Sequence, residues 1–197
     1  MKLSAKSMAL TALFAALSAL GAFLAIPAGP VSITLQTLFV LLAGILLGPR
    51  LGALSQLIYI ALGLIGLPIF SGFSGGVFSV FKPSFGFLIG FIVAAYVVGI
   101  LVEKYAKKSP VIAPDGSVSK GAYSFFKILL IALLGTVIIY LFGIPYMYII
   151  LTKVMHTDIT ISKAFQVGCL IFLPGDLLKT LMASLLGVKL LPKLRTR

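Results

Sequence analysis

An acid and a base stand in the middle of the apolar stretch Phe172-Leu173-Pro174-Gly175-Asp176-Leu177-Leu178-Lys179. The flanking segments, residues 164–173 and 180–188, make the region long enough for a membrane-spanning helix, which needs about 20 mostly apolar residues. Because Asp176 and Lys179 are three residues apart, they share one helix face. Each charge at the centre of a bilayer costs roughly 2.5 to 3.5 kcal/mol. We therefore expect this face to lie against protein, water or a ligand.

The composition outside this stretch indicates an integral membrane protein. Of the 197 residues, 60% are hydrophobic and 10% are charged, whereas a soluble domain has about 25% charged residues. The net charge of +12 comes from 16 Lys and Arg against 4 Asp and Glu. Since the basic residues lie at the ends of apolar segments, topology and anionic lipid explain them better than nucleic acid. We expect a single transmembrane domain over residues 1–197.

The apolar segments predict an all-α bundle of six transmembrane helices. Twelve of the 16 basic residues fall on one side of it, and Lys82, Lys153 and Lys163 fall on the other. Positive residues concentrate in cytoplasmic loops, so both termini are expected in the cytoplasm. Segment 104–120, with a turn at 114–117, is expected to be a polar linker within the one domain. The expected helices are 7–26, 32–47, 53–67, 84–105, 122–141 and 161–190. We expect a kink at Gly143-Ile144-Pro145, just after the fifth of these segments, and a break at Pro174-Gly175 in the sixth.

The first expected helix carries two sets of small residues at spacings of three and four. Small residues at this period let another helix backbone approach closely. One interpretation is a contact inside the bundle, and the other is a docking surface for another subunit. The first set is Ala5, Ala9, Ala12, Ala16 and Ala19, and the second is Ala15, Ser18 and Ala22.

Polar residues near the expected outer side of the second and third helices are candidates for a ligand site. Thr34, Gln36 and Thr37 lie at the start of the second helix, and Gln56 and Tyr59 share a face of the third. The alternative is that the residues at the helix start only satisfy free backbone groups or lie among lipid headgroups.

The connection at residues 68–83 mixes Gly, Ser and Phe. It has too much Gly for a stable helix and too much aromatic surface for a solvated linker. We predict a re-entrant or lid loop that buries its phenylalanines, because irregular backbone at membrane depth survives only against protein or a cavity. The alternative is an interfacial loop with phenylalanines among the headgroups.

With this topology, connections 27–33, 69–82 and 153–163 face outward and converge with Asp176 and Lys179 on one cavity. A carboxylate accepts hydrogen bonds from N–H groups, and an ammonium pairs with an acid. The pair could therefore hold a ligand that carries both an N–H group and a carboxylate. A structural ion pair and a proton relay are the alternatives.

The sequence contains no recognisable set of catalytic residues. His156 is the only histidine, and it has neither a nucleophile nor a second acid nearby apart from Asp158 in the same expected loop. We find neither metal-ligand spacing nor a phosphate-binding Gly-Lys-Ser/Thr loop. We therefore expect a protein that is not an enzyme, needs no cofactor and takes any energy from a gradient or a partner.

Four motifs in this chain form a recognisable set. They are Ser32-Ile33-Thr34-Leu35-Gln36-Thr37, Gly48-Pro49-Arg50-Leu51-Gly52, Phe81-Lys82-Pro83-Ser84 with Gly86, and Leu173-Pro174-Gly175-Asp176-Leu177-Leu178-Lys179. Together they resemble the BioY family, the biotin-binding S component of energy-coupling factor (ECF) transporters. The family usually has Arg where this chain has Lys82, and Gly where it has Phe85.

The resemblance implies an S-component-like bundle in a prokaryotic plasma membrane that captures biotin from outside. It implies a membrane T subunit and two cytoplasmic ATPases as partners, with the first helix docking on the T subunit. Asp176 would accept from the ureido N–H groups, Lys179 would orient Asp176 or bind the ligand, and Lys82 or Gln36 would meet the polar ends. Phe73, Phe78 and Phe81 would pack the thiophane ring and valeryl chain. The other expected binding residues are Thr34, Gln56, Tyr59 and Tyr146, and the expected docking residues are Ala5, Ala9, Ala12, Ala15, Ala16 and Ala19.

Two other functions stay open from the sequence. One is a stand-alone, proton-coupled carrier of a small solute with carboxylate and amide groups. The other is an S component for a different vitamin. A carrier would accumulate its solute under a pH gradient, whereas an S component would bind without pumping until its ATPase partners are added.

Overall fold

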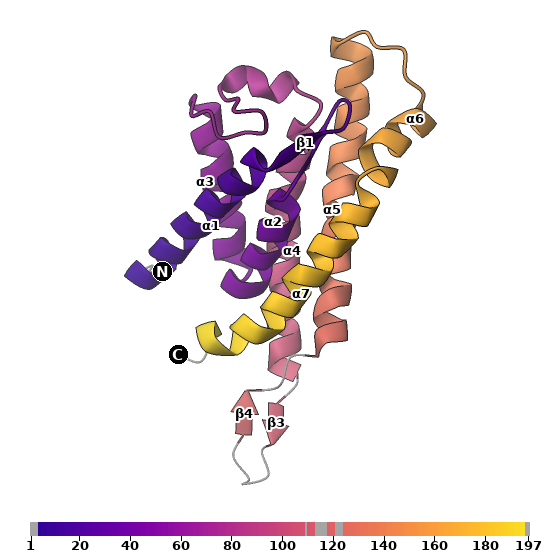
Figure 1. Cartoon of the computed structure of the whole chain (residues 1–197). Coiled ribbons are helices and arrows are strands. Elements are labelled where there is room, and N and C mark those ends of the chain that lie inside the picture. Colours follow the sequence, from indigo (N-terminus) through magenta and orange to yellow (C-terminus); the bar gives the residue numbers. More distant parts are fainter. Residues whose placement is uncertain (1–3, 109, 113–117, 121–123, 196–197) are drawn as a thin grey trace.

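The computed structural model describes residues 4–108, 110–112, 118–120 and 124–195 as a bundle of helices (Figure 1). Two short antiparallel hairpins and three short helical turns lie between or beyond the long helices. The helices are α1 (Ala5–Phe23), α2 (Gln36–Leu47), α3 (Pro49–Leu64), α4 (Phe85–Lys108), α5 (Phe125–Ile149), α6 (Ile161–Phe165) and α7 (Leu173–Arg195). The hairpins are β1 (Ala25–Pro27) with β2 (Ser32–Thr34), and β3 (Pro110–Ile112) with β4 (Val118–Lys120). The turns are a 3₁₀ helix η1 (Val77–Phe81) and two π-helical turns, η2 (Ile150–Val154) and η3 (Gln166–Leu170).

Helix α2 is the centre of the bundle and packs against α1, α3, α4 and α7. Almost all of its residues are buried, and Leu41 and Ile45 have no exposed surface. A helix that is apolar all round belongs in such a position. Its 12 residues make it roughly 18 Å long, which is shorter than the hydrocarbon core of a bilayer, about 30 Å.

The described residues are mostly helical, as predicted, but two short β hairpins interrupt the expected all-α bundle. Within the described residues, Ala5–Phe23, Phe85–Tyr105 and Phe125–Val154 are long and apolar enough to cross a membrane. The segments Ile161–Leu170 and Leu173–Pro192, bent by 40° at their junction, make a fourth span if they count as one. Since α2 and α3 are shorter, the count of six spans and the cytoplasmic termini stay predictions.

The expected boundary between the first two helices is wrong. Helix α1 ends at Phe23 and α2 begins at Gln36, and β1 and β2 pair between them. Gly29 has a φ of 86°, and Pro27 and Pro30 have no backbone N–H for a helix. These residues favour a hairpin turn over the helix extension to residue 26 that the apolar pattern predicts. Thr34 consequently lies on a strand.

Three further boundaries differ from the expected ones. Helix α3 begins at Pro49, directly after Gly48, whose φ of 82° reverses the chain in one residue. The fifth helix, expected to end at residue 141, continues through Pro145 to Ile149 and into η2, and prolines are tolerated inside membrane helices. Helix α4 runs to Lys108 before β3 and β4. The turn expected at 114–117 lies outside the described residues.

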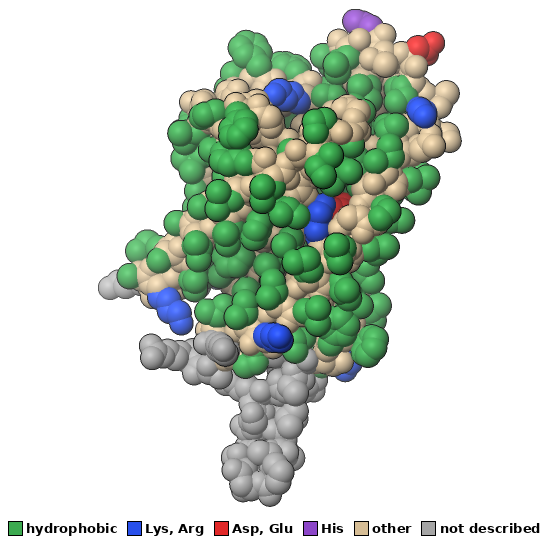
Figure 2. Space-filling view, viewed as in Figure 1, with side chains coloured by type: hydrophobic (Ala, Val, Ile, Leu, Met, Phe, Trp, Pro, Cys, Tyr) green, Lys and Arg blue, Asp and Glu red, His purple; other side chains and the backbone are tan. Residues whose placement is uncertain are grey.

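The three expected outer connections do lie at one end of the molecule, as predicted (Figure 1). The β1–β2 hairpin, the η1 loop and the α5–α6 connection form this end, and both termini lie away from it. The space-filling view shows hydrophobic side chains along the length of the bundle, with a basic and an acidic side chain together midway (Figure 2).

Gly99 of α4 is a point of close backbone approach that we expect to be sensitive to substitution. A Cβ atom there would lie 2.3 Å from the backbone nitrogen of Pro49 and 2.5 Å from the carbonyl carbon of Gly48. Because backbone cannot move aside as a side chain can, Gly99→Ala should lower the free energy of unfolding by about 1–3 kcal/mol. Thermal unfolding in detergent measures this, and an unchanged midpoint would contradict the packing of α4 on the α2–α3 turn.

Candidate functional site

The first turn of α7 presents Asp176 to the interior. The chain bends at residues 171–172, two residues before the expected break at Pro174-Gly175. Pro174 lies in the first helical turn, where a missing N–H is tolerated. The Asp176 N–H donates to the carbonyl of Phe172 (2.9 Å). A carboxylate in the first turn is stabilised by the positive end of the helix dipole.

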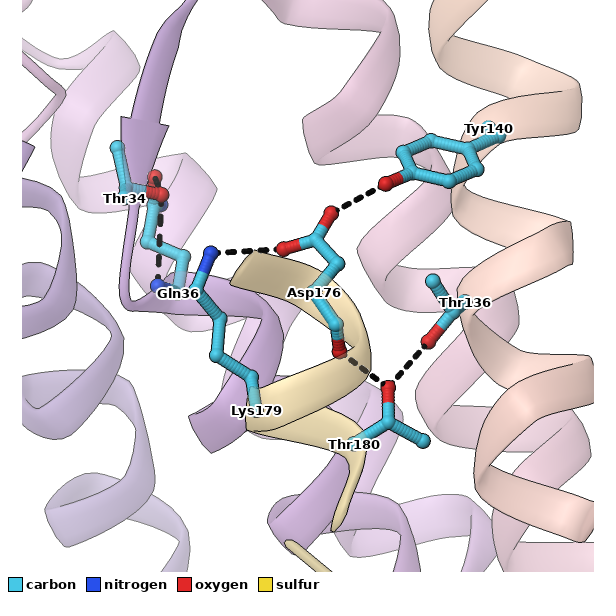
Figure 3. Close-up of polar contacts among 7 residues, drawn as sticks. All are labelled: Thr34, Gln36, Thr136, Tyr140, Asp176, Lys179 and Thr180. Carbon is cyan, nitrogen blue, oxygen red and sulfur yellow. Dashed lines mark hydrogen bonds and ion pairs between the residues drawn. The ribbon is translucent and has the colours of Figure 1, made fainter. Parts of the chain in front are cut away.

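The predicted pairing of Asp176 with Lys179 is confirmed. Lys179 Nζ donates to Asp176 Oδ1 at 2.7 Å, and the two residues are only 6% and 4% exposed. From α5, the Tyr140 hydroxyl donates to Asp176 Oδ2 at 2.5 Å (Figure 3). Thr180 donates to the Asp176 carbonyl and contacts Thr136 Oγ1 at 3.0 Å. These contacts hold the first turns of α7 against α5.

A second network of hydrogen bonds joins residues of β2, α2 and α3. Thr34 donates to Gln36 Oε1 (3.0 Å), and Gln36 Nε2 donates to the Tyr59 hydroxyl (2.9 Å). Tyr59 in turn donates to the carbonyl of Ile69 (3.2 Å). Gln36 and Tyr59 are buried, so these hydrogen bonds fix side chains inside the protein rather than on its surface.

Residues from both hydrogen-bonded networks line one cavity of about 220 Å³. Its walls combine aromatic rings with hydroxyl, amide and charged groups, the mixture typical of a small-molecule site. The aromatic residues on the wall are Tyr59, Phe70, Phe85, Phe87, Phe91, Tyr140 and Phe172. The polar residues on it are Ser32, Thr34, Gln36, Thr37, Ser71, Ser74, Ser79, Lys82, Ser84, Asp176 and Lys179.

The prediction that the 68–83 loop buries its phenylalanines is wrong for three of them. Phe73, Phe78 and Phe81 are 68%, 79% and 54% exposed and do not line the cavity. Instead Phe70 is buried, edge-to-face on Tyr59 with ring centroids 5.5 Å apart. The loop turns back on itself through the Phe70–Ser74 bridge. Composition alone could not show which phenylalanine this turn directs inward.

Gln56 and Tyr146, also expected at the site, hold the surrounding structure and do not line the cavity. Gln56 accepts from Ser18 Oγ (3.1 Å) and donates to Ser55 Oγ (3.1 Å), which joins α3 to α1. The Tyr146 hydroxyl donates to the carbonyl of Val80 and so ties η1 to α5.

The two small-residue sets of α1 face opposite ways. Ala15 is buried with Ser18 and Ala22, so its assignment to a docking surface is wrong. The other five expected docking residues form an outward strip, on which four are exposed and Ala19 is half-buried. This docking strip consists of Ala5, Ala9, Ala12, Ala16 and Ala19.

Sequence reasoning missed Tyr140 and most of the aromatic wall. A signal for Tyr140 does exist, because Thr136 and Tyr140 are four residues apart and therefore share a face of an otherwise apolar helix. Phe87 and Phe91 have the same spacing on α4. Such a pattern marks a face, but it does not say whether the face meets lipid, protein or a cavity.

Tyr140→Phe should lower the free energy of unfolding by about 1.5–3 kcal/mol, the usual contribution of a hydrogen bond to a charged group. The substitution removes the donor to Asp176 Oδ2 and keeps the ring. Tyr96→Phe, at a 45% exposed position of α4, is the matched control and should leave the unfolding midpoint unchanged. Equal midpoints for both variants would show that the Tyr140 bond does not stabilise the site.

Comparison with known proteins agrees with this architecture. The model of the BioY family matches residues 1–196. A probable biotin transporter BioY of Lysinibacillus sphaericus is 37% identical, covering 95% of this chain and 87% of the relative. The biotin transporter BioY of Rhizobium etli is 40% identical, covering 94% and 92%. The solved S-component for biotin from an ECF-type ABC transporter superposes with a TM-score of 0.78 at 27% identity, covering 96% and 94%.

Proposed function

The chain belongs to the BioY family, and we propose that it is the biotin-capturing S component of an ECF-type uptake transporter. The observation that carries the proposal is the buried Asp176–Lys179 pair on the wall of an aromatic-lined cavity. A ligand that fits must offer N–H donors to the carboxylate and apolar surface to the rings. Biotin offers both, through its ureido group and its thiophane ring with the valeryl chain.

Asp176 keeps acceptor capacity for a ligand even though both of its oxygens are engaged. A carboxylate has about four acceptor positions, and Lys179 and Tyr140 use one on each oxygen. The remaining positions would accept from the ureido N–H groups, while Lys179 would donate to the ureido oxygen. Lys82, on the same cavity wall, would attract the carboxylate of biotin.

The apolar part of biotin would pack against rings of the cavity wall rather than against the exposed phenylalanines of the loop. Phe70, Phe87, Phe91 and Phe172 are all buried and all line the cavity. Rings in such a site fix the ligand by burying its apolar surface. Phe73, Phe78 and Phe81 would reach biotin only after a movement of the η1 loop.

The remaining features of the proposal concern membrane and partners. The chain would cross a prokaryotic plasma membrane six times with both termini in the cytoplasm. The docking strip of α1 would contact a membrane T subunit, and two cytoplasmic ATPases would supply the energy. Small side chains on an outward helix face support such a contact, because they let a partner helix approach closely.

Biotin binding and transport by the reconstituted chain test this proposal. We expect the purified chain to bind biotin in preference to thiamin or riboflavin, and to accumulate it in vesicles only with an ATPase module and ATP. Accumulation by the chain alone under a pH gradient would identify a proton-coupled carrier instead. Preference for another vitamin would keep the S-component assignment and reject biotin.

Ala12→Phe should abolish ATP-dependent uptake while leaving biotin affinity within about twofold, because Ala12 is exposed in the docking strip and a large side chain blocks close helix approach. Leu130→Phe, at a 66% exposed position of α5, is the control and should leave uptake intact. The readouts are uptake with the full transporter and binding to the isolated chain. Normal uptake by Ala12→Phe would place the docking surface elsewhere.

A further inference from the structure

Ser79 carries a buried hydroxyl that no other described residue satisfies. The residue is 3% exposed, and its Oγ is the only buried side-chain oxygen or nitrogen without a hydrogen-bond partner in the described part of the chain. Other buried hydroxyls, such as those of Ser55 and Ser184, donate to backbone carbonyls at 2.7 Å. Since buried polar groups are normally hydrogen-bonded, a buried hydroxyl without a partner needs a physical explanation.

The backbone around Ser79 is held on both sides, so the orphan hydroxyl does not reflect a loose loop. The N–H of Gly76 donates to the carbonyl of Gly63 (2.7 Å), and the N–H of Ser79 donates to the carbonyl of Gly76 (3.0 Å). The hydroxyl of Tyr146 donates to the carbonyl of Val80, the next residue. The segment around Ser79 is therefore tied to α3 through Gly76 and to α5 through Val80.

Ser79 also lies beside a cation on the wall of the cavity. Both Ser79 and Lys82 line it, and the N–H of Lys82 donates to the carbonyl of Ser79 (3.1 Å). Lys82 directly follows the last residue of η1. Lys82 is exposed and offers a single ammonium, which lacks the two-pronged geometry that an Arg gives to a carboxylate. A second donor beside it would complete the recognition of an anion.

We propose that the Ser79 hydroxyl is this second donor, and that with Lys82 it binds the carboxylate of the ligand. The inference rests on the proposed function and adds to it a second residue that binds the carboxylate. The ligand's carboxylate lies at η1, and its N–H groups lie at Asp176 on α7. The hydroxyl turns about its χ1 bond to meet the carboxylate and gains in the complex the partner that it lacks in the free protein.

Ser79→Ala has opposite expected effects on stability and binding, which separates this role from a structural one. Removal of an unsatisfied buried hydroxyl leaves the unfolding midpoint of the ligand-free protein unchanged or higher. The same change should weaken biotin binding about tenfold, or about 1.4 kcal/mol. A structural serine would instead lower the midpoint and leave the affinity unchanged.

Ser184→Ala is the matched control, because Ser184 is also buried but does not line the cavity, and its hydroxyl already donates to the carbonyl of Thr180 (2.7 Å). This variant should lower the midpoint slightly and keep biotin affinity within twofold. The ligand supplies a second comparison, since biotinamide replaces the carboxylate by a neutral amide. Ser79→Ala should weaken biotin binding about tenfold and biotinamide binding less than threefold.

Calorimetric titration and thermal unfolding of the purified full chain in detergent give both readouts. A wild-type biotin affinity for Ser79→Ala overturns the proposal, and so does a lower ligand-free midpoint. An equal loss for biotin and biotinamide would show that the hydroxyl meets another part of the ligand, which overturns the assigned direction. If the wild type binds no biotin, the proposed function fails, and the midpoint comparison still tests the role of Ser79.

Discussion

Asp176→Asn is expected to weaken biotin binding about 100-fold or more. Loss of one partner of a buried, hydrogen-bonded charge pair costs about 2–5 kcal/mol in binding. Asparagine keeps the shape of the side chain but replaces one acceptor oxygen by an N–H donor. That donor would face the Lys179 ammonium or the Tyr140 hydroxyl, both of which donate to Asp176, and it would repel the ureido N–H groups of the ligand.

The control for this experiment is Asp158→Asn, because Asp158 is an exposed acid in the connection before α6. It should bind biotin as the wild type does. Titration of both purified variants with biotin measures the effect, and size-exclusion profiles and unfolding midpoints show that each is folded. A folded Asp176→Asn variant with wild-type affinity would leave the family assignment standing and move the ligand site away from α7.

The helical architecture and the centre of the site could be predicted from local sequence. A pair of charges in an apolar stretch has few stable solutions in a membrane, and the 176–179 spacing puts both on one face. The structure pairs them at 2.7 Å on a cavity wall. Gln36, Thr34, Tyr59 and Lys82 also reach that wall.

The features that could not be predicted depend on contacts between segments far apart in the chain. Tyr140 is 36 residues from Asp176 in the sequence, and no local period marks that bond. Phe70 is the phenylalanine of the 68–83 connection that points inward. It forms a backbone bridge with Ser74, and its ring packs on Tyr59. Gln56 was expected at the ligand site because it is polar and near Tyr59, yet its partner is Ser18 on α1.

The same distinction explains why helix ends were harder to predict than helix centres. Hydropathy continues past Phe23 and resumes at residue 31, so only the Pro and Gly residues between them indicate the hairpin. Conversely, Pro145 suggests a kink near the end of the fifth helix, yet α5 continues through it to Ile149 and into η2. A proline in a membrane segment therefore has a meaning that depends on what packs around it.

Lys179→Met is expected to destabilise the protein by about 3–5 kcal/mol and to abolish measurable biotin binding. The substitution keeps the long apolar stem and removes the ammonium, which leaves Asp176 as a buried carboxylate without its counter-charge. Breaking a buried pair on one side has this cost because the remaining ion has lost its water without compensation. Lys189→Met, at an exposed position of the same helix, is the matched control and should change neither property.

The double variant Asp176→Asn/Lys179→Met should recover much of the lost stability and none of the binding. Replacement of both members of a buried ion pair by neutral residues of similar volume is often neutral for stability. The two substitutions contact each other, so their effects on unfolding should be strongly non-additive. Unfolding midpoints shift by about 2–4 °C per kcal/mol for a chain of this size, which makes the recovery measurable. If the double variant were less stable than Lys179→Met, the carboxylate would stabilise the fold through groups other than Lys179, such as the Tyr140 hydroxyl. If it bound biotin, the pair would be a structural element of α7 and the ligand would lie elsewhere in the cavity.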